Sequence, residues 1–221
     1  MTNITLVGIP LSTFTRTLRM AFYHLKVDYR FEKAVPYSDN AYKYHPFGRV
    51  PSLVVKDKVL IESSVIREFI DTTIDSRLTP NSLDERLKML QIVSALSDYV
   101  FHQVVAGVAK PRHYYESQGL SEEEIQQRLK KKLQKAGEVI SAFDTLCSQQ
   151  DPFLCGPELT WADYFVFPPF ADLYSLPEAG FFQQKGPRVH AWYQQFKDRE
   201  EVRYTYPKTF ADIRDRKEAH L

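Results

Sequence analysis

The chain has 221 residues, of which 43% are hydrophobic and 26% are charged. Its 29 Lys and Arg nearly balance its 28 Asp and Glu, which leaves a formal net charge of +1. This balance provides no electrostatic footprint for a nucleic acid or an anionic membrane surface, so we expect neither as a partner. No apolar run approaches the ~20 residues of a membrane-spanning helix. The length fits one or two domains.

Metal and cysteine chemistry are also disfavoured. Cys147 and Cys155 match no zinc-site spacing, and the six histidines are scattered without a metal-ligand pair. The first residues lack a charged segment followed by a long apolar one, so no signal peptide is apparent. We therefore expect a cytoplasmic protein with reduced thiols and no metal.

The first part of the chain alternates between strand and helix signals. We predict, in order, a strand, a helix, a strand, an irregular or helical segment, a strand, a strand and a helix. The segments are 4–7, 14–25, 27–31, 36–46, 52–55, 59–61 and 66–70. This order is that of a small α/β domain built on the thioredoxin plan, over residues 1–80.

The rest of the chain shows no alternating strand pattern. Leu78–Asn81 is a cluster of helix breakers and a candidate linker. A long helix is predicted over 84–109, and Ser121–Glu124 is a capping box that opens another. Further helices are predicted after Thr160 and around 189–196. We therefore expect an all-α second domain over residues 84–221.

Ser12 stands where the first strand gives way to the first helix. Unpaired backbone N–H groups and the positive end of the helix dipole meet at such a point, so an anion is stabilised there. A serine hydroxyl can donate to the same anion. The simpler interpretation is that Ser12 or Thr13 is only the N-cap of the helix.

Val50-Pro51 directly precedes a predicted strand. Proline cannot sit inside a sheet ladder, so it belongs at the first position of the strand or in a tight turn. A cis bond here would free the backbone of Val50 to pair with an extended peptide ligand.

Glu62-Ser63-Ser64 lies between the last predicted strand and its helix. A serine here can cap the helix and bind a carboxylate at its N-terminus. The adjacent Glu62 suits an ammonium, so the pair fits the head group of an α-amino acid. A plain helix cap beside a surface glutamate is the alternative.

Together these segments resemble the cytosolic glutathione S-transferase family, in its order and spacing over nearly the whole chain. The matching stretches are Ser12–Arg16, His45–Leu53, Glu62–Ile66, Leu78–Pro80, Phe153–Gly156 and Leu159–Asp163. The resemblance implies a thioredoxin-like, glutathione-binding domain followed by an all-α helical-bundle domain. It also implies a homodimer.

The resemblance assigns expected roles to single residues. Val50 would pair through its backbone with the cysteinyl part of glutathione, and Pro51 would be the cis-proline that exposes it. Glu62 and Ser63 would hold the γ-glutamyl head. Arg49 stands where relatives bind the glycyl carboxylate, and arginine can bind a carboxylate bidentately.

Ser12 would then activate the glutathione thiol, whose pKa is ~8.5 when free. A hydroxyl hydrogen bond and the helix N-terminus favour the thiolate, which would attack a hydrophobic electrophile. A serine at this position resembles the tau, phi, theta and zeta classes. The sequence around it resembles the phi or theta class in one stretch and the tau class in another. Thr15 is the alternative donor if the loop is shifted.

The electrophile pocket is expected between the domains, lined by Phe14, Tyr99, His102 and Ala106. The last three share one face of the predicted long helix by their spacing. Ordinary packing between domains is the competing interpretation.

Two other functions fit the same glutathione site. One is another glutathione-dependent reaction, such as peroxide reduction, dehalogenation or isomerisation. The other is a non-catalytic module that binds glutathione or another ligand.

Overall fold

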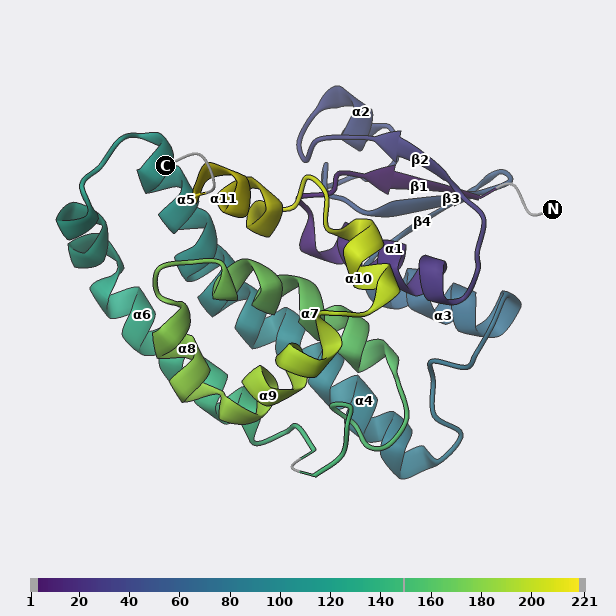
Figure 1. The fold of residues 1–221 in the computed structure, drawn as a ribbon. Coiled ribbons are helices and arrows are strands. Elements are labelled where there is room, and N and C mark those ends of the chain that lie inside the picture. The colour runs from purple at the N-terminus through teal and green to yellow at the C-terminus, as the bar shows by residue number, and fades with distance from the viewer. Residues whose placement is uncertain (1–3, 149, 219–221) are drawn as a thin grey trace. The chain divides into compact units, whose positions relative to one another are not determined.

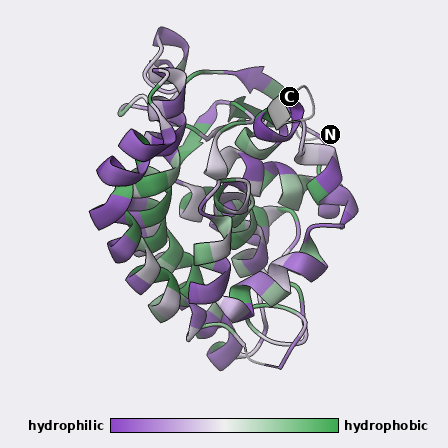
Figure 2. Cartoon of the chain, turned by 60° about the vertical axis from the view of Figure 1, so that its left-hand side comes forward, coloured by the Kyte–Doolittle hydropathy of each residue, from purple (hydrophilic) through white to green (hydrophobic). Residues whose placement is uncertain are grey.

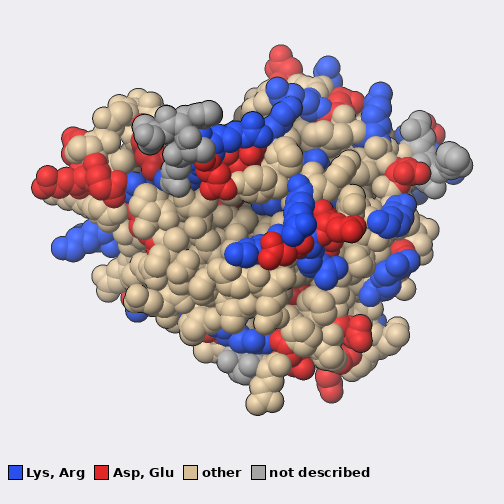
Figure 3. Space-filling view, in the orientation of Figure 1, with Lys and Arg blue, Asp and Glu red and all other residues tan. Residues whose placement is uncertain are grey.

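A computed structural model describes residues 4–148 and 150–218, which group by their contacts into two compact units (Figure 1). The first unit comprises Met1–Thr79 and Asp198–Leu221, and the second comprises Pro80–Lys197. The residues inspected for a signal peptide, 1–3, lie outside the described ranges. On the face drawn in Figure 3, acidic and basic side chains are interspersed, in keeping with the neutral charge balance.

A four-stranded mixed sheet forms the centre of the first unit. Its strands β1 (Ile4–Gly8), β2 (Arg30–Lys33), β3 (Ser52–Val55) and β4 (Lys58–Ile61) are ordered β2-β1-β3-β4. Strand β1 runs parallel to β2 and antiparallel to β3, and β3 runs antiparallel to β4. This is the thioredoxin-like arrangement that the sequence predicted.

One strand boundary differs from expectation, and the hairpin turn contains a residue with a positive φ. The second strand begins only at Arg30, because Val27 still belongs to the turn after the first helix and donates its N–H to Phe22 O at 2.9 Å. In the β3–β4 hairpin, Lys56 has a φ of 53°. The turn thus places a lysine in the left-handed conformation that glycine adopts more easily.

Helices cover both faces of this sheet. Figure 1 shows α1 (Thr13–His24) and α3 (Ser63–Thr73) on one side and the short α2 (Asp39–Tyr42) on the other. Buried Val7, Ala34 and Ala41 form a small core cluster, against which Tyr44, Val50 and Val54 pack. This cluster supports the backbone that precedes β3.

The second unit is built only of helices within the described residues. They are α4 (Leu83–Ala95), the π-helix η1 (Leu96–Ala109), α5 (Lys110–Ser117), α6 (Glu122–Asp144), α7 (Trp161–Tyr174), α8 (Ala179–Lys185) and α9 (Pro187–Phe196). Helix α7 is buried on every side from Trp161 to Leu173, as expected for a central core helix. In Figure 2 hydrophobic residues lie on the inward sides of the surrounding helices.

The predicted long helix at 84–109 is present but changes its winding. The buried side chains of η1 are Leu96, Val100, Val104, Val105, Val108 and Ala109, and its hydrogen bonds join residues five apart, so it winds more loosely than an α-helix. By length and composition, 83–117 is one helix apolar enough to cross a membrane. Its most apolar window is 44% buried, and core helices of soluble proteins pass the same test.

The end of the chain packs on the first unit, whereas we expected one all-α domain over 84–221. Helices α10 (Glu200–Thr205) and α11 (Phe210–Glu218) follow the second unit in sequence, and α10 packs on α1. Arg16 Nε donates to Thr205 Oγ1 at 3.5 Å, and the rings of Tyr23 and Tyr204 lie 4.8 Å apart. These helices are short and rich in charge, so their periodicity did not indicate which domain they join.

Asp163 fixes the start of α7. Its carboxylate is fully buried and accepts four hydrogen bonds, at 2.9–3.1 Å, from Leu154 N, Thr160 N, Thr160 Oγ1 and Trp192 Nε1. Desolvation outweighs these donors and raises the pKa of Asp163 to about 6. The predicted Thr160–Asp163 helix start is therefore a buried, fully occupied structural cap.

Candidate functional site

The register of the sheet brings the predicted site segments together at one end of its strands. Val7 of β1 pairs with Ser52 of β3, and Ser52 pairs with Ile61 of β4. The segments that leave this row are 8–12, which leads into α1, 50–51, which leads into β3, and 62–63, which leads into α3. Three stretches that are distant in sequence therefore begin or end at the same end of the sheet's strands.

Ser12 is the N-cap residue of α1, as predicted. Its backbone is extended, with φ −79° and ψ 121°, and its Oγ accepts the N–H of Thr15 at 3.3 Å. The first turn of α1 contains no acidic residue to offset the positive end of the helix dipole. Because the hydroxyl serves the helix only as an acceptor, its own proton stays available for an anion.

Thr15, the alternative donor, points into the protein. Its side chain is 0% exposed. A Cβ added to Gly8 would lie only 2.5 Å from Thr15 Oγ1, so the hydroxyl packs directly against the end of β1 and requires glycine there. A ligand on the surface cannot reach this hydroxyl, which favours Ser12.

The peptide bond between Val50 and Pro51 is cis, as the resemblance implied. Val50 is half-buried, and within the described part of the chain its N–H and C=O form no hydrogen bond. An unpaired backbone donor and acceptor on one residue are what an extended peptide needs in order to pair with that residue through its own backbone.

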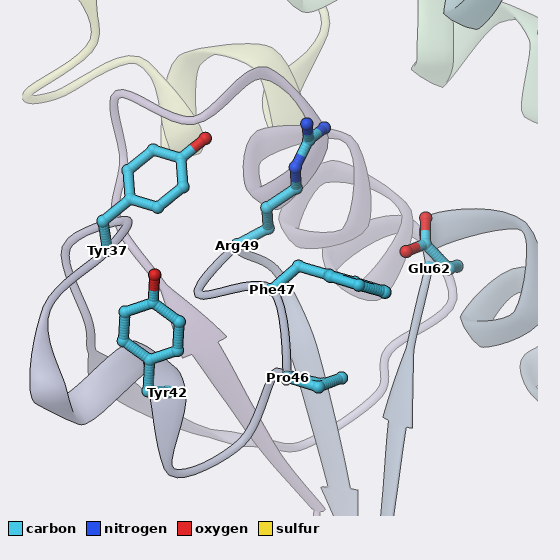
Figure 4. A pocket seen from close by; sticks show the side chains of 6 residues that line it. All are labelled: Tyr37, Tyr42, Pro46, Phe47, Arg49 and Glu62. Carbon is cyan, nitrogen blue, oxygen red and sulfur yellow. The ribbon is translucent and has the colours of Figure 1, made fainter.

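Arg49 and Glu62 line one surface hollow of about 500 Å³, together with Tyr37, Tyr42, Pro46 and Phe47 (Figure 4). The hollow thus places a guanidinium and a carboxylate among three exposed aromatic side chains. Opposite charges held apart in one site suit a ligand that carries both a carboxylate and an ammonium.

Sequence reasoning missed Tyr37 and Tyr42. A Cβ on Gly48 would lie 2.6 Å from the Tyr42 ring, so the ring packs on the bare glycine backbone, which has a φ of 62°. Tyr37 itself has a φ of 65°, and its N–H donates to Gly48 O at 2.6 Å. The one available signal was His45-Pro46-Phe47-Gly48, whose glycine allows this close approach.

Glu62 is the N-cap residue of α3, whereas we expected a serine to cap this helix. Ser63 is the first helical residue, and the Glu62 side chain makes no capping hydrogen bond. Instead the C=O of Glu62 accepts the N–H groups of Val65 and Ile66 at 3.0 Å. The φ of Glu62 is 66°, which turns its side chain away from the helix and leaves it 60% exposed. Such a conformation is costly for a non-glycine residue and is concentrated at functional sites.

Two family models match the chain, and they cover both units. One, described as Glutathione S-transferase, N-terminal domain, matches residues 6–77, and the other, described as Glutathione S-transferase, C-terminal domain, matches residues 123–195. The chain belongs to the glutathione S-transferase family. No curated protein matches this chain with significant similarity.

Solved structures of glutathione transferases share the fold at low sequence identity. Glutathione transferase F7 from Populus trichocarpa is 20% identical with a TM-score of 0.77, and the match covers 92% of this chain and 97% of that one. A homolog from Drosophila mojavensis with bound glutathione has 20% identity, a TM-score of 0.77 and 98% coverage of both chains. The theta class enzyme from Xanthomonas axonopodis pv. citri, also with glutathione bound, has 20% identity, a TM-score of 0.74 and coverages of 95% and 100%.

The predicted electrophile residues lie in different units. Phe14 is half-buried in α1 of the first unit. Tyr99, His102 and Ala106 are all exposed on η1 of the second. The expectation that they share a face assumed α-helical winding, and their role in a pocket stays a prediction.

Proposed function

We propose that this chain is an enzyme, a glutathione transferase that activates the glutathione thiol for attack on a hydrophobic electrophile. One observation carries the proposal. Three features lie at the same end of the sheet's strands: the hydroxyl of Ser12 at a helix N-terminus, the unpaired backbone of Val50 and the pocket lined by Arg49 and Glu62. These are an anion site, a peptide site and a pair of opposite charges.

Each part of glutathione has a partner in this arrangement. The N–H and C=O of Val50 would pair with the cysteinyl residue through backbone hydrogen bonds, just ahead of β3. Glu62 would accept from the γ-glutamyl ammonium, and Ser63, in the first turn of α3, would donate to its carboxylate. Arg49 would bind the glycyl carboxylate, with the hydroxyls of Tyr37 and Tyr42 beside it. The glutathione-bound relatives support this ligand.

The chemistry requires the thiol to lose its proton before it attacks. Ser12 O–H would donate to the thiolate, which would also lie at the positive end of α1. Lowering the thiol pKa by two units corresponds to ~2.7 kcal/mol, about the strength of one charge-assisted hydrogen bond plus a dipole contribution. The thiolate sulfur then bonds to the electrophilic carbon, and the leaving group departs with its electron pair. No protein side chain is covalently modified.

The electrophile is the open part of the proposal. Phe14 and the exposed side of η1 with Tyr99, His102 and Ala106 are our candidates for its contacts. Glutathione-dependent peroxide reduction, dehalogenation or isomerisation would use the same glutathione site. A panel of halogenated aromatics, enones, organic peroxides and cis-enols separates these reactions.

We also propose a homodimer, as in the relatives that the sequence resembles. Leu83, Leu87 and Leu90 recur on one side of α4 and are 58%, 49% and 38% exposed. Such an apolar stripe is typical of an interface. Light scattering should give twice the monomer mass, and Leu87→Glu should halve it. Cytoplasmic localisation stays a prediction.

A titration of thiolate absorbance with protein in excess over glutathione tests the proposal. We expect the bound thiol to titrate well below ~8.5, and Ser12→Ala to return it toward that value without abolishing binding. Thr15→Val is the matched control, since its hydroxyl is buried, and should leave the thiol pKa unchanged. Binding without a shift would contradict activation and favour a non-catalytic module. No binding at millimolar glutathione would contradict the proposal altogether.

A further inference from the structure

His45 is a buried imidazole beside the candidate glutathione pocket, and the proposed chemistry does not use it. It is 3% exposed. Its own backbone is fixed on both sides, because its N–H donates to Ala41 O at 2.9 Å and its C=O accepts from Gly48 N at 2.8 Å. The side chain therefore has a defined place just ahead of the segment that carries Arg49 and Val50.

The two ring nitrogens of His45 face different parts of the site. Nδ1 accepts the N–H of Phe47 at 3.2 Å, and Nε2 lies 3.7 Å from Oε1 of Glu62. Because Nδ1 acts as an acceptor, the neutral ring carries its proton on Nε2 and directs it at the carboxylate. One imidazole thus spans from the Phe47 loop to the residue at the start of α3.

The charges around His45 oppose one another. Burial lowers its pKa, Glu62 acts in the opposite direction, and Arg49 adds to the lowering. The Phe47 ring, with its centroid 5.9 Å away, is the aromatic neighbour. Protonation would place a second proton on Nδ1, where the N–H of Phe47 already occupies the lone pair, so a charged ring and the present loop conformation are incompatible.

We propose that neutral His45 is a positioning residue that holds the Glu62 carboxylate and the Phe47–Arg49 loop in register for the γ-glutamyl and glycyl ends of one ligand. His45 touches neither end itself. Its protonation releases the loop and weakens binding. This inference rests on the proposed glutathione site and adds to it a residue that keeps the two ends of the site together.

The probe is S-methylglutathione, because its thioether has no proton to titrate and its other groups do not titrate between pH 5 and 8. We expect its Kd for the wild-type protein to rise progressively as the pH falls below the ordinary histidine pKa of ~6.5, and several-fold by the lowest pH at which the protein stays folded. The thiol pKa of bound glutathione should not depend on His45, which separates positioning from activation.

Two substitutions separate the two contacts. In His45→Asn the side-chain oxygen can still accept the N–H of Phe47, two residues on, but cannot reach Glu62. We expect a several-fold higher Kd at pH 7.5, and we expect the rise in Kd at low pH to disappear. His45→Leu removes both contacts and should weaken binding roughly tenfold or more. His190→Asn, in the second unit, is the control. It should keep both the affinity at pH 7.5 and the rise in Kd at low pH.

A rise in Kd at low pH that persists in His45→Asn would overturn the inference, as would His45 variants that bind S-methylglutathione like the wild type. Nitrogen chemical shifts give a readout that needs no variant, and a proton on Nδ1 at neutral pH would also overturn it. If the wild-type protein binds no glutathione, the proposed function fails and takes the inference with it. If it binds and the His45 variants are unchanged, only the inference fails.

Discussion

Glu62 and Asp163 are both acidic residues at helix N-termini, but their surroundings are opposite. Asp163 is fully buried and accepts four hydrogen bonds. Glu62 is 60% exposed and caps nothing with its side chain, and among the described residues its carboxylate has one ionisable neighbour, His45 Nε2 at 3.7 Å. One carboxylate has all its partners within the fold, whereas the other is open to a ligand.

The comparison separates an acid that stabilises the fold from one that the proposed site would use. A buried carboxylate that leaves donors unpaired when removed is a determinant of stability. An exposed carboxylate held at a φ of 66° costs the fold free energy, and such strained residues are concentrated at functional sites. The following changes test that division.

The largest expected effect is from Asp163→Ala. It leaves the N–H groups of Leu154 and Thr160 and the indole of Trp192 without an acceptor in the core. We expect the free energy of unfolding to fall by more than ~3 kcal/mol, since each buried orphan costs ~1–3 kcal/mol. Urea unfolding at constant m-value measures this. Glu62→Ala is the matched control and should stay within ~0.5 kcal/mol. Equal losses would dissolve the comparison.

The pH dependence of stability should also separate the two residues. The folded-state pKa of Asp163 is raised to about 6, from an ordinary 3.8. The protonated form is therefore favoured by folding, so its contribution is full below pH ~4 and is lost as the pH rises to ~6 and above, by up to about 3 kcal/mol. Urea midpoints between pH 4 and 7, compared with Asp163→Asn, isolate this change. A contribution that grows with pH would contradict it.

Glu62→Gln should affect binding rather than folding. Loss of the charge opposite the γ-glutamyl ammonium should weaken glutathione binding by ~10- to 100-fold, the size expected for a charge-assisted hydrogen bond. Calorimetry measures the Kd, and the unfolding midpoint should hardly move. Glu68→Gln, on the exposed side of the same helix, is the control. Weaker binding by Glu68→Gln alone would place the ammonium elsewhere.

The smallest expected effect has the opposite sign. Glu62→Gly should raise the free energy of unfolding by ~1 kcal/mol, because glycine adopts positive φ without strain. The same variant should lose glutathione affinity as Glu62→Gln does. A destabilised Glu62→Gly would mean that the side chain contributes to the fold after all.

Local features of this chain were predictable from the sequence. The cap at Ser12, the capping box at Ser121–Glu124 and the β3–β4 hairpin all depend on residues a few positions apart. The fold class and the cis bond at Pro51 followed from a resemblance whose motifs lie in order along the chain. Short-range chemistry and motif order sufficed for these.

Other features depend on contacts that no local pattern encodes. Tyr37 and Tyr42 enter the pocket because the chain folds back over Gly48. The cap at Glu62 depends on a backbone dihedral, which hydrophobic periodicity does not report. Likewise, the pairing of α10 with α1 joins residues such as Arg16 and Thr205, which are 189 positions apart.

The packing of α10 on α1 affects the order in which the two units can be completed during synthesis. Helix α1, which presents Ser12, leaves the ribosome before residues 80–197, whereas α10, which packs on it, follows them. The all-helical unit of residues 80–197 emerges complete in between and can fold as domains generally do, as a unit. The unit that contains Ser12 is therefore completed only after residues 80–197 have been synthesised, and a chain cut short near residue 197 would leave α1 without α10.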